Sequence, residues 1–388
     1  MVLIARQAEI MTETSRQTGQ TSLLLHISDL RGGGAERQFS ILAEHLDRER
    51  FDPHACFWRP VKRYTLPDDI PVSYLRKTRP WHVLPLVRDL RNLVQTTKPD
   101  LVYSQLHYVN MVTGTALAGL SSAPRWICRI SNDPRREMRG IFAIWARRAI
   151  RRADRVVCCS RGVAQQTQAY LKIDPDRIVQ LDNLADTTKI DRLSAAEVPT
   201  IKRDGVFVIV HAGRFHRQKN QSLLLRAFAR LKDLDAELWM LGEGELEDEL
   251  RSEAVRLAVS DRVRWLGFQS NPYPFFRAAD CFALTSDFEG SPNVLIEAMI
   301  CGLPVVSTTC PFGPDEIVSN GVTGFLFDPR DEIGAARAIT EIARGSGSRM
   351  GEEGRKIAVR RFGLDRTLQS FEDLFEEVAL TPGRFSTV

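Results

Sequence analysis

Two basic side chains follow closely after one apolar segment of this 388-residue chain. Val206–Ala212 reads as a buried strand, and Gly213, Arg214 and Lys219 come next. Arginine can bind a phosphate through two parallel hydrogen bonds, and lysine adds a compact positive charge. Because ligands of α/β sheets bind at the carboxyl ends of the strands, this pair predicts a diphosphate site that needs no metal ion. A solvated basic turn is the alternative.

Two glutamates, Glu289 and Glu297, stand eight positions apart around a predicted strand-to-helix turn. The strand Cys281–Thr285 precedes the first, and a helix that begins near Asn293 carries the second. A helix N-terminus presents free N–H groups and the positive end of the helix dipole, which suits an anion. Glu297 has apolar neighbours, so its carboxylate needs hydrogen-bond donors, and ribose hydroxyls would serve. The alternative is one capping glutamate and one surface glutamate.

The first half of the chain holds a glycine turn and a histidine in comparable positions. Gly32–Gly34 follows the apolar run Leu23–Leu30, so the backbone there could approach a phosphate or an acceptor closely. The dinucleotide-binding pattern G-x-G-x-x-G is not satisfied, which disfavours an oxidoreductase. His107 comes just after the predicted strand Leu101–Ser104. Either a role at the reacting sugar or a purely structural role fits this position.

The elements that must hold these residues alternate between strand and helix. Thirteen predicted strands point to an α/β chain of two Rossmann-like, doubly wound domains that face each other across a cleft. The pattern breaks over Asp186–Gly205, where we place the domain linker. We therefore expect a disordered leader over residues 1–21, a first domain over 22–195 and a second over 196–364. Residues 365–388 hold a helix, and its spacing leaves open whether it crosses back to the first domain.

Composition fits a globular protein of the reducing cytoplasm. Hydrophobic residues make up 43% of the chain, and its seven scattered cysteines form no C-x-x-C pair. The N-terminus lacks the apolar segment of a signal peptide. Residues 1–190 carry 29 Lys and Arg against 19 Asp and Glu, and residues 191–388 carry 24 against 30. The basic half indicates an anionic partner, but no nucleic-acid motif accompanies it, so we expect no nucleic acid.

Several motifs in order resemble glycosyltransferase family 4, a retaining family of the GT-B fold. The strongest is TSDFEGSPNVLIEAMICGLPVVSTTC, which starts at Thr285. GGGAER, GRFHRQKN, LGEGELEDEL, WLGF and GPDEIVSNGVTGFLFDP match further landmarks, so the resemblance covers roughly Leu23 to Phe375. It implies transfer of a sugar from a UDP- or GDP-sugar to a glycan or polyprenyl-linked acceptor. No divalent metal and no other cofactor would be required.

The resemblance also implies roles for individual residues. Arg214 and Lys219 would bind the donor diphosphate, and Glu297 would bind the ribose. Glu289 and His107 would face the donor sugar. The remaining positions expected around the donor are Gly33, Gly34, Gly213, Gly242, Gly244, Phe268, Gly290, Ser291, Asn293 and Val294. Family members often carry a small aliphatic residue where Pro292 stands, so this chain has one backbone donor fewer at the helix start.

Two further expectations concern partners. Arg129 and Asn132, at the end of another predicted strand, are weaker candidates for the acceptor side. The segment 140–155 combines aromatic, aliphatic and arginine residues, which is typical of a helix on an anionic membrane surface and equally of a sheet-covering helix. The first interpretation predicts peripheral binding to the inner face of the cell membrane. The alternatives to a transferase are a nucleotide-sugar epimerase or phosphorylase of the same architecture and a non-catalytic nucleotide-sugar-binding protein.

Overall fold

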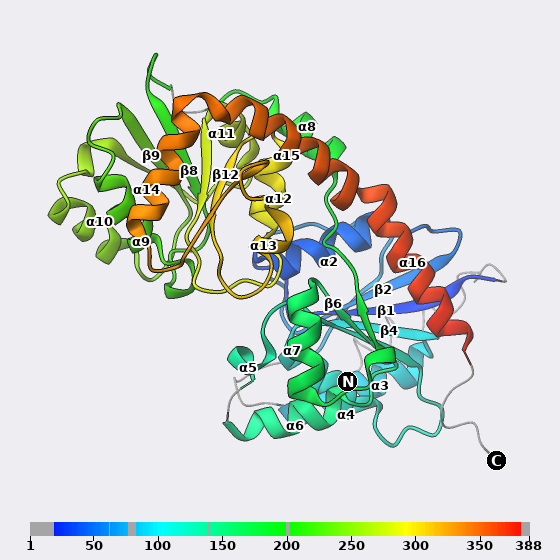
Figure 1. Ribbon diagram of the computed structural model, residues 1–388. Coiled ribbons are helices and arrows are strands. Elements are labelled where there is room, and N and C mark those ends of the chain that lie inside the picture. The colour runs from blue at the N-terminus through cyan, green and yellow to red at the C-terminus, as the bar shows by residue number, and fades with distance from the viewer. Residues whose placement is uncertain (1–18, 62, 77–82, 139, 199–201, 382–388) are drawn as a thin grey trace.

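The protein folds into two α/β domains, each built on a fully parallel sheet (Figure 1). The computed structural model describes residues 19–381 apart from residues 62, 77–82, 139 and 199–201. The expected leader therefore lies almost wholly outside the described residues. Helices cover the faces of both sheets, and this arrangement confirms the two Rossmann-like domains expected from the sequence.

The first sheet has seven strands in the order β3-β2-β1-β4-β5-β6-β7. Their bounds are Thr21–His26 (β1), Phe51–Phe57 (β2), Val72–Tyr74 (β3), Leu101–Gln105 (β4), Arg125–Ile130 (β5), Arg155–Cys158 (β6) and Ile178–Gln180 (β7). The helices of this part are Gly34–His45 (α2), Val83–Thr97 (α3), His107–Leu117 (α4), Pro134–Glu137 (α5), Gly140–Ile150 (α6), Arg161–Leu171 (α7) and Thr187–Ser194 (α8). Strand order reverses beside β1, so the β1–α2 turn opens at the sheet's crevice.

The second sheet has six strands in the order β10-β9-β8-β11-β12-β13. Their bounds are Phe207–Ala212 (β8), Ala236–Leu241 (β9), Val263–Gly267 (β10), Cys281–Leu284 (β11), Val305–Thr308 (β12) and Gly324–Phe327 (β13). The helices are Gln221–Ala229 (α9), Glu247–Arg256 (α10), Tyr273–Ala278 (α11), Asn293–Ile300 (α12), Pro314–Ile317 (α13), Glu332–Glu341 (α14), Gly347–Phe362 (α15) and Leu364–Leu380 (α16). Here the order reverses between β8 and β11, the two strands whose following loops carry the predicted site.

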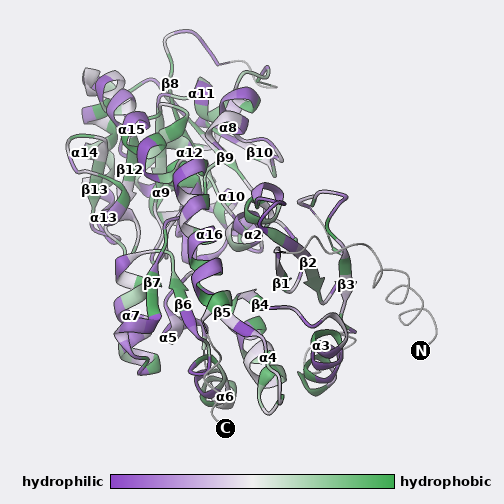
Figure 2. Cartoon of the chain, turned by 90° about the vertical axis from the view of Figure 1, so that its right-hand side faces the viewer, coloured by the Kyte–Doolittle hydropathy of each residue, from purple (hydrophilic) through white to green (hydrophobic). Residues whose placement is uncertain are grey.

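Buried hydrophobic side chains form core clusters on both faces of each sheet. The colours of Figure 2 show hydrophobic residues in strands such as β2 and β5. In β1, Leu24 packs into one core cluster, whereas Leu23 and Leu25 pack into the cluster on the opposite face. Side chains alternate across a strand, so a strand covered on both sides must be apolar throughout. The continuous apolar runs in the sequence are therefore explained by burial on two sides.

The chain passes between the domains twice. It leaves the first domain after β7, and α8 already packs on α11 and α12 of the second domain, although it precedes the boundary predicted after residue 195. It returns through α16, which packs on β4 and β5 (Figure 1). The two passages touch each other, because Ala185 and Gly363 form a β-bridge and Arg361 binds the carboxylate of Asp182 at 2.8 and 2.9 Å.

The seven cysteines all lie in the described part of the chain, and none forms a disulfide. Burial raises the pKa of the Cys158 and Cys159 thiols to about 12, so neither is a ready nucleophile. The expectation of reduced thiols is consistent with this arrangement. Among the described residues, no helix is long and apolar enough to cross a membrane.

Candidate functional site

The loop after β8 carries both predicted diphosphate-binding cations. Lys219 ends a short helical turn, and its side chain lies 3.7 Å from where a Cβ atom would stand if Gly213 carried one. Arg214 is exposed, and within the described residues its guanidinium forms no ion pair. Gly213 donates its N–H to Leu241 at the end of β9, so the loop is fixed to the neighbouring strand. One cation is therefore held in place and the other is open to a ligand.

Glu289 lies buried opposite Lys219, in the loop between β11 and α12. Its Oε1 lies 2.6 Å from Lys219 Nζ and accepts a second hydrogen bond of 2.6 Å from Ser286 Oγ. The pair joins the loops after β8 and β11, which flank the reversal in strand order. The structure thus brings together two of the predicted site residues at the edge where ligands of such sheets bind.

The start of α12 meets the glycine turn of the first domain. The Asn293 side chain donates to the carbonyl of Gly34 at 2.9 Å, and its oxygen accepts hydrogen bonds from Gln38 and Asn183. Asn183 also donates to the carbonyl of Ser291 at 2.9 Å. The first N–H groups of a helix have no intrahelical acceptor, so the tip of α12 can bind an anion beside this turn.

Glu297, the expected ribose ligand, already has a cationic partner from the other domain. Arg37 Nη1 of α2 lies 3.0 and 3.1 Å from its two carboxylate oxygens, and the Arg37 guanidinium also donates to the hydroxyl of Tyr273. Burial raises the pKa of Glu297, and Arg37 opposes that shift. A buried carboxylate without such a partner would be costly, so the pair couples the donor side to the first domain.

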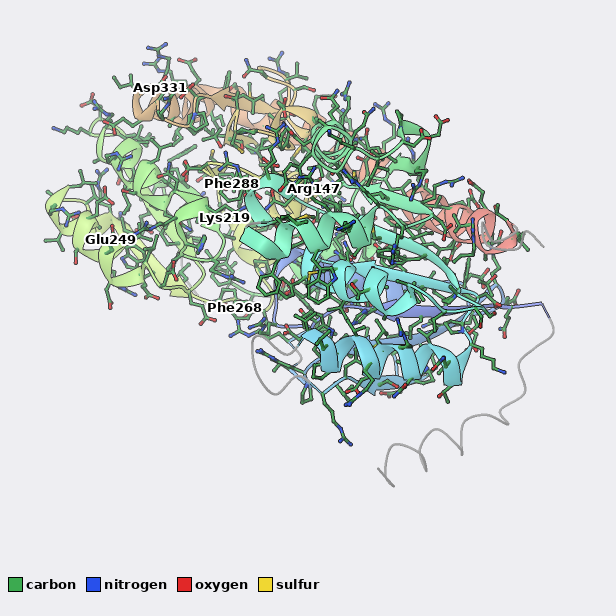
Figure 3. The ribbon with its side chains drawn as sticks, turned by 90° about the horizontal axis from the view of Figure 1, so that it is seen from below. Arg147, Lys219, Glu249, Phe268, Phe288 and Asp331 are labelled. Atoms are coloured by element: carbon green, nitrogen blue, oxygen red, sulfur yellow. The ribbon has the colours of Figure 1, made fainter. Side chains whose placement is uncertain are left out.

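Other contacts show that the two domains are closed on each other. Gly290 lies against the first domain so tightly that a Cβ atom there would be 1.9 Å from the carbonyl oxygen of Ser131. Arg136 of α5 lies 4.4 Å from the ring centroid of Phe288. Figure 3 shows Phe288 and Lys219 near each other where the domains meet. Only glycine permits this approach at position 290.

Phe268 and the glycines after β9 form the outer end of the same boundary. Phe268 is 44% exposed, and the Arg63 guanidinium of the first domain lies 4.5 Å from its ring centroid. Arg63 also forms an ion pair of 2.8 Å with Glu243, which stands between Gly242 and Gly244. An exposed aromatic face flanked by polar groups can stack a planar base.

His107 and Arg129, two further candidates from the first domain, have different surroundings in the structure. His107 begins α4, and its Nδ1 lies 3.1 Å from Glu137 Oε2, but among the described residues it forms no hydrogen bond or ion pair with Glu289. Arg129 is fully buried, donates to Asn183 at 2.6 Å and lies over the ring of Phe371. The expectation that Arg129 serves the acceptor side is therefore wrong, because its guanidinium is part of the core.

Sequence reasoning missed the residues that bridge the domains. Arg37, Gln38, Asn183 and Arg63 all contact predicted donor residues, yet none was singled out. One signal was available for Arg37: it stands in the first turn of the helix that follows the glycine turn, facing the same crevice. Within the described part of the chain, no three or more His, Cys, Asp or Glu side chains are grouped so that they could hold a metal ion.

Two family models match the chain and together span most of it. Residues 32–189 match the model described as Glycosyltransferase Family 4, and residues 206–344 match the model of Glycosyl transferases group 1. The chain belongs to glycosyltransferase family 4. The two matches fall on the two α/β domains of this family-4 protein and include both the glycine turn and the Glu289–Glu297 segment.

Curated relatives carry names from bacterial glycan synthesis. The family-4 protein is 32% identical over 226 residues to lipopolysaccharide core biosynthesis glycosyltransferase LpsE of Rhizobium meliloti. This match covers 58% of this chain and 64% of the relative. It is also 34% identical over 181 residues to a 4-alpha-N-acetylgalactosaminyltransferase of Campylobacter jejuni whose name includes a diphospho-undecaprenol substrate. That match covers 47% of this chain and 48% of the relative. The matched region thus spans less than two thirds of each relative.

Solved structures confirm the GT-B arrangement. A glycosyltransferase from Rickettsia africae superposes with a TM-score of 0.78 at 18% identity, covering 94% of this chain and all of the other. Anabaena HepE, solved with UDP-glucose, superposes with a TM-score of 0.76 at 21% identity, covering 92% of this chain and all of HepE. Identities this low speak for the fold, and the chemistry has to be argued from this chain's own residues.

Proposed function

We propose that this family-4 protein transfers a sugar from a nucleoside-diphosphate sugar to a hydroxyl group of a glycan or lipid-linked glycan, with retention of the anomeric configuration. One observation carries the proposal: the tip of α12, the Gly33–Gly34 turn and the loop of Arg214 and Lys219 converge where the domains meet. These are groups that bind and neutralise a diphosphate. The names of the curated relatives support a donor and acceptor of this kind.

The mechanism follows from where charge develops. When the sugar leaves the diphosphate, negative charge grows on the leaving oxygen and positive character grows on the anomeric carbon. Arg214, Lys219 and the helix tip stabilise the first, and the carboxylate of Glu289 holds the hydroxyls of the sugar. These fixed charges supply what a divalent ion would otherwise supply, so we include metal independence in the proposal. The closed domains exclude water and limit hydrolysis.

Substitution of Arg214 by alanine tests the donor site most cleanly. Its side chain is exposed and unpaired within the described residues, so folding should be unaffected while turnover falls roughly a hundredfold. Release of nucleotide from a panel of UDP- and GDP-sugars, with EDTA present, measures the effect, and a thermal melt checks the fold. Arg217→Ala, an exposed arginine on the same loop, is the control.

Three results would count against this proposal. Wild-type turnover in Arg214→Ala would remove the diphosphate assignment. A product of unchanged size would favour an epimerase. Tight binding of a donor without turnover on any acceptor would leave a nucleotide-sugar-binding protein. Because a bound donor stabilises the folded state, the melt of the unmodified protein also identifies the nucleotide.

We further propose that α6 rests on an anionic membrane at the cytoplasmic face. Its inner face, Ala143, Ala146 and Ala149, packs towards α4. Ile144 is 61% exposed on the other side, beside basic residues, whereas Phe142 is 39% exposed and its ring lies 5.7 Å from that of Tyr108 on α4. Exposed apolar side chains next to arginines are what a lipid interface accepts.

Co-sedimentation with vesicles tests the membrane proposal. The double variant Ile144→Ser with Arg148→Ser should lose most of the binding to vesicles that contain phosphatidylglycerol, because it removes one inserted side chain and one cation. The matched control is Val255→Ser with Arg256→Ser on α10, where Val255 is 68% exposed. Equal sedimentation of both variants, or no preference for anionic lipid, would refute the proposal.

A further inference from the structure

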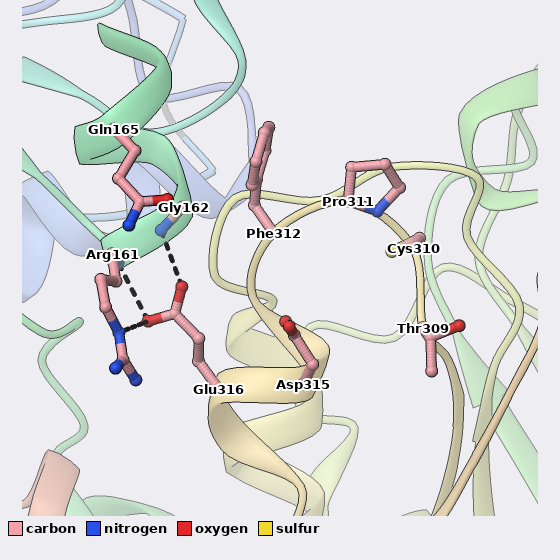
Figure 4. A pocket seen from close by; sticks show the side chains of 9 residues that line it. All are labelled: Arg161, Gly162, Gln165, Thr309, Cys310, Pro311, Phe312, Asp315 and Glu316. Atoms are coloured by element: carbon pink, nitrogen blue, oxygen red, sulfur yellow. Dashed lines mark hydrogen bonds and ion pairs between the residues drawn. The ribbon is translucent and has the colours of Figure 1, made fainter. Parts of the chain in front are cut away.

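A cavity of about 390 Å³ opens between the two domains, beside the site described above (Figure 4). Arg161, Gly162 and Gln165 of α7 form its wall in the first domain. The loop after β12, with Phe312, and the start of α13, with Asp315, form the wall in the second. The volume lies within the roughly 300–1,000 Å³ typical of small-molecule sites, which favour domain interfaces.

The two walls are held together by a contact across the boundary. The Glu316 carboxylate accepts hydrogen bonds of 2.9 and 2.8 Å from the N–H groups of Arg161 and Gly162 at the start of α7. A carboxylate is favoured at a helix N-terminus, so this contact stabilises the closed arrangement. Figure 4 shows Glu316 directed to the helix start. The cavity therefore has its full shape only when the domains are closed.

One wall residue adopts a costly backbone conformation. Phe312 has a φ of 69°, in the left-handed region that bulky residues avoid, and is followed by Gly313 with a φ of 97°. Its ring packs on Gly162, where a Cβ atom would lie 2.2 Å from the ring. Backbone strain of this kind concentrates at ligand sites. The strained turn places an aromatic ring at the cavity, and such a ring can pack on the apolar face of a sugar.

The remaining groups select a neutral, hydroxyl-rich ligand. Asp315 is exposed and has no ion pair within the described residues, and the Gln165 side chain forms no hydrogen bond there. Glu316 is a second carboxylate, and Arg161 is the one cation among the lining residues, so the cavity repels a phosphate. A carboxylate, an amide, a guanidinium and an aromatic ring together match the hydroxyls and the C–H face of a sugar.

The cavity adjoins the expected position of the donor sugar without sharing its residues. The N–H of Glu289 donates to the carbonyl of Pro311, a lining residue, at 3.5 Å. None of the residues that line the cavity is among those expected to bind the donor. We propose that this cavity binds the acceptor, holding the sugar ring that presents or adjoins the attacking hydroxyl. This inference rests on the proposed function.

Binding of simple glycosides tests the inference on the full chain. The probes are the methyl glycosides of glucose, galactose, N-acetylglucosamine and N-acetylgalactosamine, followed by saturation-transfer NMR with and without UDP. Asp315→Asn keeps the shape but removes the charge, and it should weaken the glycoside that binds by about tenfold or more. Gln165→Ala should weaken binding of the same glycoside severalfold. The affinity for UDP, which uses other residues, should stay within about twofold.

Matched controls separate a local from a general effect. Gln168→Ala lies one turn further along the same helix, and Asp248→Asn changes an exposed carboxylate in the first turn of α10. Neither should alter glycoside binding. The inference is overturned if no probe binds, if Asp315→Asn and Gln165→Ala bind as the controls do, or if sugar binds this cavity only without nucleotide. Failure of UDP and GDP to bind at all would instead refute the donor site.

Discussion

At the scale of single residues, the candidate site consists of charged side chains that are largely paired with one another. Lys219 faces Glu289, and Arg37 faces Glu297. Each pair is largely buried, so each charge depends on its partner. Arg214 alone among the predicted site cations is left exposed and without an ion pair in the described residues. The proposed donor would meet these existing ion pairs, and the pair of Arg37 with Glu297 can be tested by substitution.

Substitution of Arg37 by methionine should destabilise the protein more at high pH than at low pH. Burial raises the pKa of Glu297, and loss of Arg37 raises it further. A carboxyl whose folded-state pKa is raised adds stability below its unfolded-state value and loses that stability as pH rises through the folded-state value. Urea unfolding at pH 5 and pH 8 should show a penalty of about 3 kcal/mol at pH 8 and a smaller one at pH 5.

The double variant Arg37→Met with Glu297→Gln supplies the control for that prediction. It removes both charges, so its own stability should lack the pH dependence that Glu297 contributes in the single variant. The same double variant also reports on the proposed ribose contact, because a glutamine amide still accepts one hydroxyl. A pH-independent penalty in the single variant would show that Glu297 is not the titrating group.

At the scale of elements, most of the fold could be predicted because buried parallel strands are apolar throughout. Every expected strand is present, with ends displaced by a few residues. The run Leu23–Leu30 was read as one strand, but β1 ends at His26, since Asp29 pairs with Arg31 in the turn that follows. Helix α15 was not predicted. Gly351 breaks its apolar pattern and is required there, because a Cβ atom would lie 2.0 Å from the carbonyl oxygen of Gly302.

The site could be predicted only in part, for a related reason. Loop residues at strand ends follow from the strand pattern, so Lys219 and Glu289 could be placed at one sheet edge. Arg37 and Glu297 are 260 positions apart, and their meeting depends on how two domains close. Spacing along a chain carries no information about that geometry. The resemblance to a family supplied roles for residues but no partners for them.

Helix α16 is predicted to be indispensable to the first domain. Phe375 is fully buried against Phe51 and Tyr103 of the first sheet, with ring centroids 6.0 and 5.3 Å away. Phe375→Ala should lower the free energy of unfolding by about 3–5 kcal/mol, measured by urea titration. Leu380→Ala, at the exposed end of the same helix, should change it by less than about 0.5 kcal/mol. Similar values for both would show that α16 does not stabilise this core.

At the scale of the whole molecule, the closed arrangement depends on close backbone contact between the domains. Gly290→Ala would set a methyl group 1.9 Å from the carbonyl oxygen of Ser131 in the closed form. We expect the variant to fold normally but to stay open, with a larger radius of gyration in small-angle X-ray scattering and much reduced turnover. The open form separates the walls of the acceptor cavity as well.

Gly354→Ala is the matched control for closure. It adds a methyl group inside α15, where the nearest atoms are 3.6 Å away and ordinary contact results. Scattering and turnover should both match those of the unmodified protein. If Gly290→Ala were as compact and as active as this control, closure of the kind seen here would not be needed for the reaction.

The bridge between Ala185 and Gly363 limits what motion remains available. Two rigid domains joined by a single segment of chain can twist, slide and rotate relative to each other. Here two connecting segments lie side by side, which leaves chiefly a hinge rotation about an axis through both segments. The domains should therefore open by rotation about one hinge axis at the two connecting segments. The contacts between the domains would then break and re-form in a fixed order, and those farthest from the hinge would break first.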